Sequence, residues 1–168
     1  MANNASKLLA IIFALVTLTS TAVIVYSLDS YVGVSLAVRS VSAFVEDFSF
    51  ELVDEGHLIV TTNVVVNNTS SYEFHWIGLE QQVYVNDTYA GTARSINITQ
   101  MKPVPIPPRA YTNHTLELHV NFEHKPELFE WILDPTVTKT WITFVDVFCE
   151  GPLIGSFRLS TSALKEMS

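Results

Sequence analysis

The chain has 168 residues, of which 48% are hydrophobic and 15% charged, and its formal net charge is -8. This length suits one domain with an appendage, and the composition excludes a disordered acidic chain and a basic nucleic-acid binder, so we expect no nucleic-acid partner. Cys149 is the only cysteine, which excludes a disulfide within the chain and leaves packing to hold the fold.

The first predicted element is a charge-free apolar segment from Leu8 to Leu28. As a helix it would rise about 31 Å, close to the thickness of the hydrocarbon core of a bilayer, and it would satisfy its own backbone amides there. We therefore predict a transmembrane helix over residues 8–28 with the lipid bilayer as its partner. A cleaved signal peptide, with an apolar stretch from Leu8 to Leu18 and a small-residue site ending at Ala22, is the alternative.

The charges that flank this segment predict its orientation. Lys7 precedes it and Asp29 follows it, and all 17 acidic residues of the chain lie beyond it. Because positive charge favours the cytoplasmic side, residues 1–7 are predicted to be a cytoplasmic N-terminus and residues 29–168 an extracellular domain. The expected location is the cell membrane, crossed once.

Small residues recur at helical spacing within the segment, namely Ala10, Ala14, Thr17 and Thr21. Such a stripe lets a second helix approach closely, which makes it a candidate helix-packing surface. A helix rich in Ala and Thr also produces such stripes by chance.

Asparagines that begin Asn-x-Ser/Thr triplets are enriched after the segment. Five triplets occur, where about one or two are expected by chance. They begin at Asn67, Asn68, Asn86, Asn97 and Asn113. Their number predicts N-glycosylation of a domain on the far side of a membrane.

Strand parity predicts where these acceptors point. In residues 115–123 apolar and polar residues alternate, which places Asn113 on the polar face. Leu58, Val60, Val64 and Val66 share the inward face of an earlier strand, which turns Asn67 outward. Asn86 shares the parity of polar neighbours, and Asn97 lies between two inward isoleucines. We therefore expect no acceptor in the core.

The outer domain reads as successive short strands with turn signals between them. The predicted strands cover residues 48–53, 58–66, 77–85, 89–98, 115–123, 136–149 and 153–160. The proline-rich residues 101–109 suit an edge or a connection, and residues 125–133 predict a short helix. Residues 31–47 either continue the first helix or begin a strand, and their alternation favours the strand. The predicted fold is an antiparallel β-sandwich of about seven strands with one short helix.

The order of these features resembles the late-embryogenesis-abundant group 2 family, also called the water-stress and hypersensitive-response (WHy) domain, over roughly residues 34–162. The likeness is carried by "VVVNNTSS", "IGLEQQVYVNDTYAGTA", "VPIPP", "TLELHVNF" and "PELFEWIL". The chain departs from the family at Asn68, where proline is frequent. The resemblance implies an immunoglobulin- or fibronectin-like sandwich without catalytic residues, in proteins linked to desiccation and stress that stabilise or bind other molecules. Some plant members share the plan of a cytoplasmic start, one span and a glycosylated outer domain.

No constellation of residues predicts catalysis. His119 and Glu123 share a strand face, and an acidic cluster spans residues 46–55, but neither has the ligand spacing of a metal site. Nucleophile-elbow, phosphate-loop and zinc-helix motifs are absent from the sequence, so we predict no catalytic residue, no metal and no cofactor. Cys149 is expected to be buried and inert.

The strand over residues 136–149 is apolar on both faces. Trp141, Val145 and Val147 share one face, and Ile142, Phe144 and Phe148 share the other. Either both faces are covered, which we favour, or one is open to a partner.

These patterns predict a non-enzymatic, single-pass membrane protein whose glycosylated sandwich binds or stabilises other surface proteins, with self-association as a further possibility. The alternative is a pilin-like filament subunit with the N-terminal helix in the filament core, although Leu8 follows Lys7 where such precursors carry a small residue. A secreted hydrolase would need a nucleophile–base pair, which the sequence does not supply.

Overall fold

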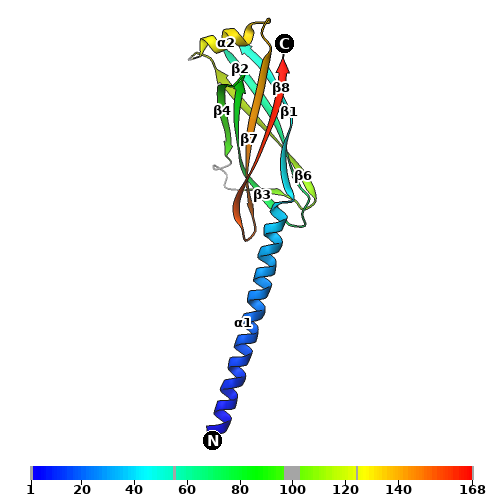
Figure 1. Ribbon diagram of the computed structural model, residues 1–168, viewed down its shortest axis with the longest axis vertical. Coiled ribbons are helices and arrows are strands. Elements are labelled where there is room, and N and C mark those ends of the chain that lie inside the picture. The colour runs from blue at the N-terminus through cyan, green and yellow to red at the C-terminus, as the bar shows by residue number, and fades with distance from the viewer. Residues whose placement is uncertain (1, 55, 97–102, 124, 168) are drawn as a thin grey trace.

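The computed structural model describes residues 2–54, 56–96, 103–123 and 125–167, and it places a β-sandwich at the end of one long helix (Figure 1). Helix α1 (Ala2–Val38) projects from one end of the sandwich, and helix α2 (Pro126–Leu133) covers the opposite end. These two ends are called the helix end and the distal end below.

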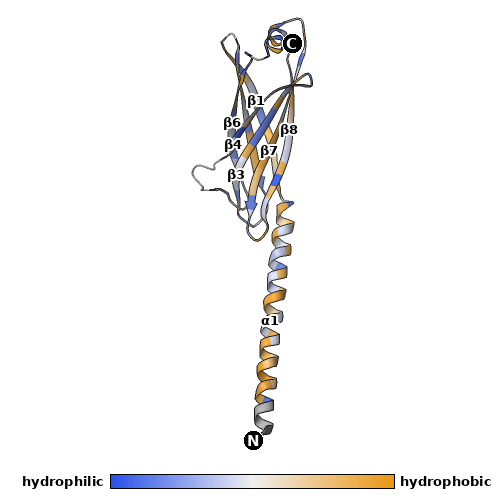
Figure 2. Cartoon of the chain, turned by 90° about the vertical axis from the view of Figure 1, so that its left-hand side faces the viewer, coloured by the Kyte–Doolittle hydropathy of each residue, from blue (hydrophilic) through white to orange (hydrophobic). Residues whose placement is uncertain are grey.

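Helix α1 carries no charge and is mostly apolar from Leu8 to Leu28 (Figure 2). The side chains of this stretch are exposed. The hydroxyls of Thr17 and Thr21 donate to the carbonyls of Phe13 and Thr17, each at 2.8 Å, so these polar side chains are satisfied within the helix. Within the described residues one helix, over Lys7–Val38, is long and apolar enough to cross a membrane, a property that signal sequences share. The predicted helix over residues 8–28 is confirmed as a helix.

The preference for a strand over residues 31–47 is wrong for its first half. Helix α1 continues without a break to Val38, and strand β1 (Val41–Asp54) begins three residues later. Val34 (1% exposed) and Ala37 face the sandwich at helical spacing, whereas Leu36 is 56% exposed. The spacing of the apolar residues is compatible with the period of a strand and with the period of a helix. Burial of one helical face favours the helix.

Eight antiparallel strands within the described residues form two sheets. The three-stranded sheet has the order β1, β2 (His57–Asn68) and β6 (Ala110–Asn121). The five-stranded sheet has the order β4 (Thr88–Ile96), β3 (Phe74–Val85), β7 (Lys139–Gly151) and β8 (Gly155–Met167), and the short β5 (Val104–Ile106) pairs with the start of β3. The predicted sandwich is confirmed, with strands longer than expected and with the proline-rich segment at an edge.

The core between the sheets consists of two apolar clusters. The cluster at the helix end includes Val64, Val66, Leu79 and Val145, and the distal cluster includes Val60, Val83 and Trp141. Leu58, Val60, Val64 and Val66 are all buried, as their parity predicted. Thr62, Gln81 and Thr143 lie between the clusters at the intermediate inward position of β2, β3 and β7, and all three are fully buried.

Helix α2 lies where the sequence predicted a short helix, and it closes the distal end of the sandwich. Pro126 occupies its first turn, where a missing amide hydrogen costs nothing. Leu128 is buried, and Phe129, Trp131 and Ile132 pack against the distal cluster. This apolar face explains why a helix of only 8 residues is retained there.

Candidate functional site

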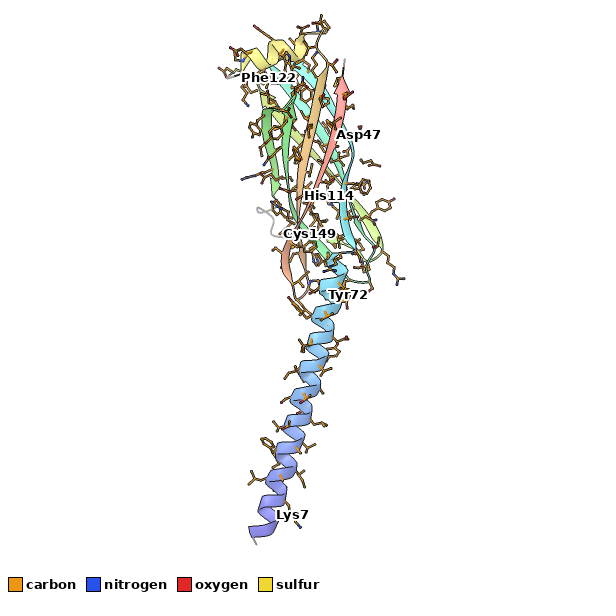
Figure 3. The ribbon with its side chains drawn as sticks, viewed as in Figure 1. Lys7, Asp47, Tyr72, His114, Phe122 and Cys149 are labelled. Atoms are coloured by element: carbon orange, nitrogen blue, oxygen red, sulfur yellow. The ribbon has the colours of Figure 1, made fainter. Side chains whose placement is uncertain are left out.

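The junction between α1 and the sandwich is a packed interface. Val34 and Ala37 are buried, and Ala37 belongs to the cluster at the helix end. A Cβ on Gly33 would lie 2.7 Å from the Tyr72 hydroxyl, so the glycine allows this close approach (Figure 3). The sandwich also holds the turn after the helix, because Thr69 donates to the Ser40 carbonyl through both its amide and its hydroxyl at 3.0 Å. Helix and sandwich are therefore coupled without a linker.

The small-residue stripe of α1 lies along an exposed side of the helix. Ala14, Thr17 and Thr21 line a shallow hollow there, between Phe13 and Leu18, and Ala10 is exposed one turn earlier. This geometry leaves room for a second helix, and contact with one stays a prediction.

Two of the five glycan acceptors lie on the outer face of the three-stranded sheet. Asn113 on β6 is exposed, and Asn67 on β2 is half-buried opposite Ser42 and Tyr111. Asn86 lies in the turn between β3 and β4 in a left-handed conformation (φ 41°), with its Nδ2 donating to the Thr138 carbonyl at 3.2 Å. Asn97 lies outside the described residues. Glycosylation of these positions stays a prediction.

Asn68, the fourth described acceptor, lies in the core with an exposed fraction of 0%. Its Nδ2 donates to the carbonyls of Tyr72 at 2.8 Å, Pro107 at 3.0 Å and Ile106 at 3.2 Å. Its Oδ1 accepts from the amide and the hydroxyl of Ser70 at 3.1 and 2.7 Å. The side chain therefore holds the loop after β2 against the segment around β5.

The expectation that no acceptor lies in the core is wrong for Asn68. In "VNNTS" consecutive residues should point to opposite faces, so an outward Asn67 requires an inward Asn68. Strand parity alone is therefore enough to predict that Asn68 is buried. A buried amide that fully uses its hydrogen-bonding capacity is a structural residue, and a glycan on Nδ2 would disrupt this arrangement.

The outer face of the five-stranded sheet is open, against the favoured prediction of a strand covered on both faces. Strand β7 is central between β3 and β8 and buries Trp141, Val145 and Val147. On its other face Phe144 is 47% exposed. Parity shows that both faces are apolar but cannot show what covers them.

Aromatic and aliphatic side chains gather on this open face around Phe144. Tyr84 packs edge-on against Phe144, with ring centroids 5.8 Å apart, and against Tyr89 at 5.5 Å. Ile142 pairs with Tyr84 on one side and with the exposed Leu164 on the other. We call Tyr84, Tyr89, Ile142, Phe144 and Leu164 the aromatic patch. It is a candidate surface for a protein partner.

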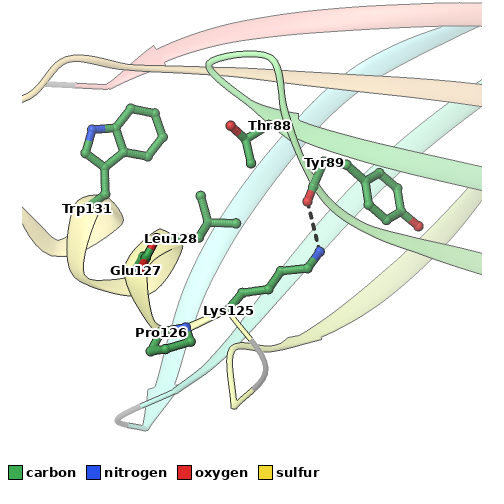
Figure 4. Close-up of a pocket in the computed structure, with 7 residues that line it drawn as sticks. All are labelled: Thr88, Tyr89, Lys125, Pro126, Glu127, Leu128 and Trp131. Atoms are coloured by element: carbon green, nitrogen blue, oxygen red, sulfur yellow. Dashed lines mark hydrogen bonds between the residues drawn. The ribbon is translucent and has the colours of Figure 1, made fainter.

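A hollow of about 590 Å³ lies at the distal end between α2 and the turn that joins β3 to β4 (Figure 4). Its walls include Thr88, Tyr89, Leu128 and Trp131. The Lys125 ammonium donates to the carbonyls of Tyr89 at 2.9 Å and Ala90 at 3.3 Å. Because this charge is used within the protein, the hollow has a mixed polar and apolar lining and lacks a free cation among its described lining residues.

The remaining ionisable groups do not assemble into a described site. Among the residues that the structure describes, no group of three or more His, Cys, Asp or Glu could hold a metal ion. His119 lies 3.9 Å from Glu117, and Asp47 of the acidic cluster lies 3.8 Å from the Lys165 ammonium. Burial raises the pKa of the Cys149 thiol to about 12, so it is the buried, unreactive cysteine that the sequence predicted.

A Trp–His pair links the two sheets near the helix end. The rings of Trp76 on β3 and His114 on β6 lie 4.4 Å apart between centroids with an interplanar angle of 31°. The His114 Nε2 is 3.0 Å from the Thr112 hydroxyl, and burial lowers the pKa of His114. This pair was missed in the sequence because the two residues are far apart along the chain.

The comparisons with known proteins show a shared fold. No model of a known protein family matches the chain, and no curated protein matches its sequence. A protein from Archaeoglobus fulgidus has a TM-score of 0.54 and 13% identity over 77% of this chain and 94% of that one. The Arabidopsis thaliana protein AT1g01470 has a TM-score of 0.60 and 13% identity over 75% and 80%. A late embryogenesis abundant (LEA) protein, At2g46140.1, has a TM-score of 0.49 and 15% identity over 88% and 84%. The first two likenesses show a common β-sandwich, the fold that the resemblance to the LEA group 2 family implies.

Proposed function

We propose that the chain is a non-enzymatic, single-pass membrane protein that holds a glycosylated, LEA-like sandwich at the outer surface of a cell, where it binds or stabilises other surface proteins. The observation that carries this proposal is the unbroken helix α1. Its charge-free stretch is exposed on all sides, while Val34 and Ala37 in its last turns are buried at the junction with the sandwich. Exposed apolar side chains over about 30 Å are costly in water and stable in lipid.

The two outer faces of the sandwich support different roles. The three-stranded sheet presents mostly polar side chains along β6, with Asn67, Asn113 and the exposed rings of Phe44 and Tyr111. The five-stranded sheet presents the aromatic patch. Glycans on Asn67 and Asn113 would keep the first face in solvent. The described acceptor of the five-stranded sheet, Asn86, lies in the turn at its distal end, so the middle of the second face is the candidate surface for a partner.

Cysteine labelling in intact cells tests the topology. Because Cys149 is fully buried, Glu127→Cys at the distal end and Asn3→Cys at the N-terminus each introduce one reactive thiol. A membrane-impermeant maleimide should label Glu127→Cys in intact cells and Asn3→Cys only after permeabilisation. The reverse pattern would refute the orientation, and a mature chain that begins after Ala22 would refute the anchor.

A filament subunit is a second candidate, favoured by the short connection from α1 to strand β1 of the sandwich. A filament needs a long apolar helix that is held rigidly to an outer domain, and the junction at Val34 and Ala37 provides that coupling. Mass spectrometry of the mature protein separates the two candidates. An intact start supports the anchor, whereas removal of residues 1–7 supports the filament.

A further inference from the structure

The turn between β7 and β8 reaches back along α1, away from the sandwich (Figure 1). Leu153 at this turn is 68% exposed. It shares a shallow apolar hollow with a stretch of α1 that includes Ile24, Leu28 and Tyr31. Leu28 lies about 9 Å before the buried Val34 along the helix, so the turn extends past the junction toward the charge-free segment.

The conformation of the turn directs Leu153 outward. Leu153 has a left-handed backbone (φ 68°), which is uncommon for a leucine and is retained only where the surroundings impose it. The next residue, Ile154, packs against the cluster at the helix end. Ile154 therefore fixes the turn to the core, while Leu153 projects into open space.

The junction places Leu153 beside the end of the charge-free segment of α1. Val34 and Ala37 are buried where the helix meets the sandwich, and the Tyr72 hydroxyl approaches Gly33. Figure 3 shows Tyr72 at this junction. Leu28 ends the charge-free segment, and Asp29 is the first charge after it. The hollow that contains Leu153 is therefore level with the end of the predicted span, where Tyr26 and Tyr31 suit the interface between lipid and water.

We infer that the β7–β8 turn is a second membrane contact, in which Leu153 enters the outer leaflet at the boundary between headgroups and acyl chains. This inference rests on the proposed anchoring by α1. It adds a contact on the side of the helix where the turn lies, and two membrane contacts define the orientation of the sandwich relative to the bilayer.

The experiment uses the full-length chain reconstituted in phosphatidylcholine vesicles that contain lipids with a nitroxide near the headgroup. A fluorescent maleimide is attached to one introduced cysteine at a time, with Cys149 remaining buried. The test site is Leu153→Cys. Its matched control is Leu133→Cys, another exposed leucine at the distal end, and Val16→Cys in the middle of the apolar segment reports on the anchor.

We expect the nitroxide lipids to quench the label at Leu153→Cys at least twofold more than the label at Leu133→Cys. Equal, weak quenching at positions 153 and 133, together with a blue-shifted and shielded label at Val16→Cys, would overturn the second contact and leave the anchor standing. A solvent-exposed label at Val16→Cys would overturn the anchor and, with it, this inference. A nitroxide side chain at position 153, with its accessibility to oxygen and to a water-soluble nickel complex, repeats the measurement without an apolar dye.

Discussion

Asn68 shows how a single polar side chain can determine the geometry of a loop. Its amide bridges the loop after β2 and the segment around β5, and it accepts two hydrogen bonds from Ser70. Asn68→Ala would leave these buried groups without partners, each of which costs about 1–3 kcal/mol. We expect a loss of about 2–4 kcal/mol in the free energy of unfolding, measured by urea denaturation of protein made without glycans.

The matched control is Asn67→Ala on the outer face of the same strand. This change should cost less than about 0.5 kcal/mol, because surface substitutions away from special features are nearly neutral. In protein from a glycosylating host, mass spectrometry should find Asn68 unmodified. A glycan on Asn68 of the folded protein would contradict its structural role.

His114 gives the sandwich a pH dependence of known sign. Burial lowers its pKa, so the folded protein binds fewer protons at this group than the unfolded chain does. Stability is then fully present above the ordinary histidine pKa of about 6.5 and is lost as the pH falls below it toward the folded value. We expect the free energy of unfolding to fall between pH 7 and pH 5.5.

The variant His114→Phe tests this assignment, since it keeps a ring against Trp76 and removes the titrating group. It should flatten the pH dependence between pH 7 and pH 5.5, whereas His119→Gln, on an exposed side chain, should leave the slope unchanged. Retention of the full slope in His114→Phe would assign the effect to other groups.

At the scale of the elements, periodicity predicts most strands of the sandwich. Alternation located β2 and β6 and assigned Val60 and Val64 to the core, because one face of each strand is buried and the other is solvated. The end of α1 could not be decided in this way, because Val34 and Val38 fit both a strand and a helix. Only the position of the rest of the sandwich shows which face of that segment is buried.

The candidate site was less predictable than the fold. Five acceptors were recognised from local triplets, but whether a triplet lies in the core depends on neighbours such as Ile106, which are remote in sequence. The aromatic patch is exposed because no described element covers the outer face of β7, and the local sequence does not show whether such a face is covered. The burial of Gln81 does follow from parity, since it lies between Leu79 and Val83.

The buried layer of Thr62, Gln81 and Thr143 makes a further prediction at this scale. Gln81 Nε2 donates to the two threonine hydroxyls at 2.6 and 3.2 Å, and its Oε1 is buried without a partner among the described residues. Replacing a partly satisfied polar group together with its partners by apolar groups of similar shape is neutral or stabilising. We expect the triple variant Thr62→Val, Gln81→Leu, Thr143→Val to unfold at equal or higher urea concentration.

The single variant Gln81→Ala is the comparison, because it creates a cavity between the two apolar clusters. It should lose about 2–4 kcal/mol, in the range of large-to-small changes in cores. A triple variant that is as unstable as the single variant would show that the polar layer is required for the alignment of the two sheets.

At the scale of the whole molecule, the sandwich presents two different outer faces at the end of α1. If the chain works by binding another surface protein, that partner should contact the outer face of the five-stranded sheet, which carries the aromatic patch. A photo-crosslinking amino acid at Phe144 should then capture a neighbouring protein in native membranes. The same amino acid at His119, which is exposed on the outer face of the three-stranded sheet, should capture far less.

The identity of the captured protein separates the remaining alternatives. A second copy of the chain, crosslinked through Phe144, would place the patch in a self-associated assembly, and a different membrane protein would assign the chain to an accessory role. Changing Phe144 to Ser should reduce co-purification of either partner at least severalfold while altering stability by less than about 1 kcal/mol, because the side chain is half exposed. Equal crosslinking from positions 144 and 119 would exclude the patch as the binding surface. Helix α1 and the distal hollow would then be the candidate binding surfaces.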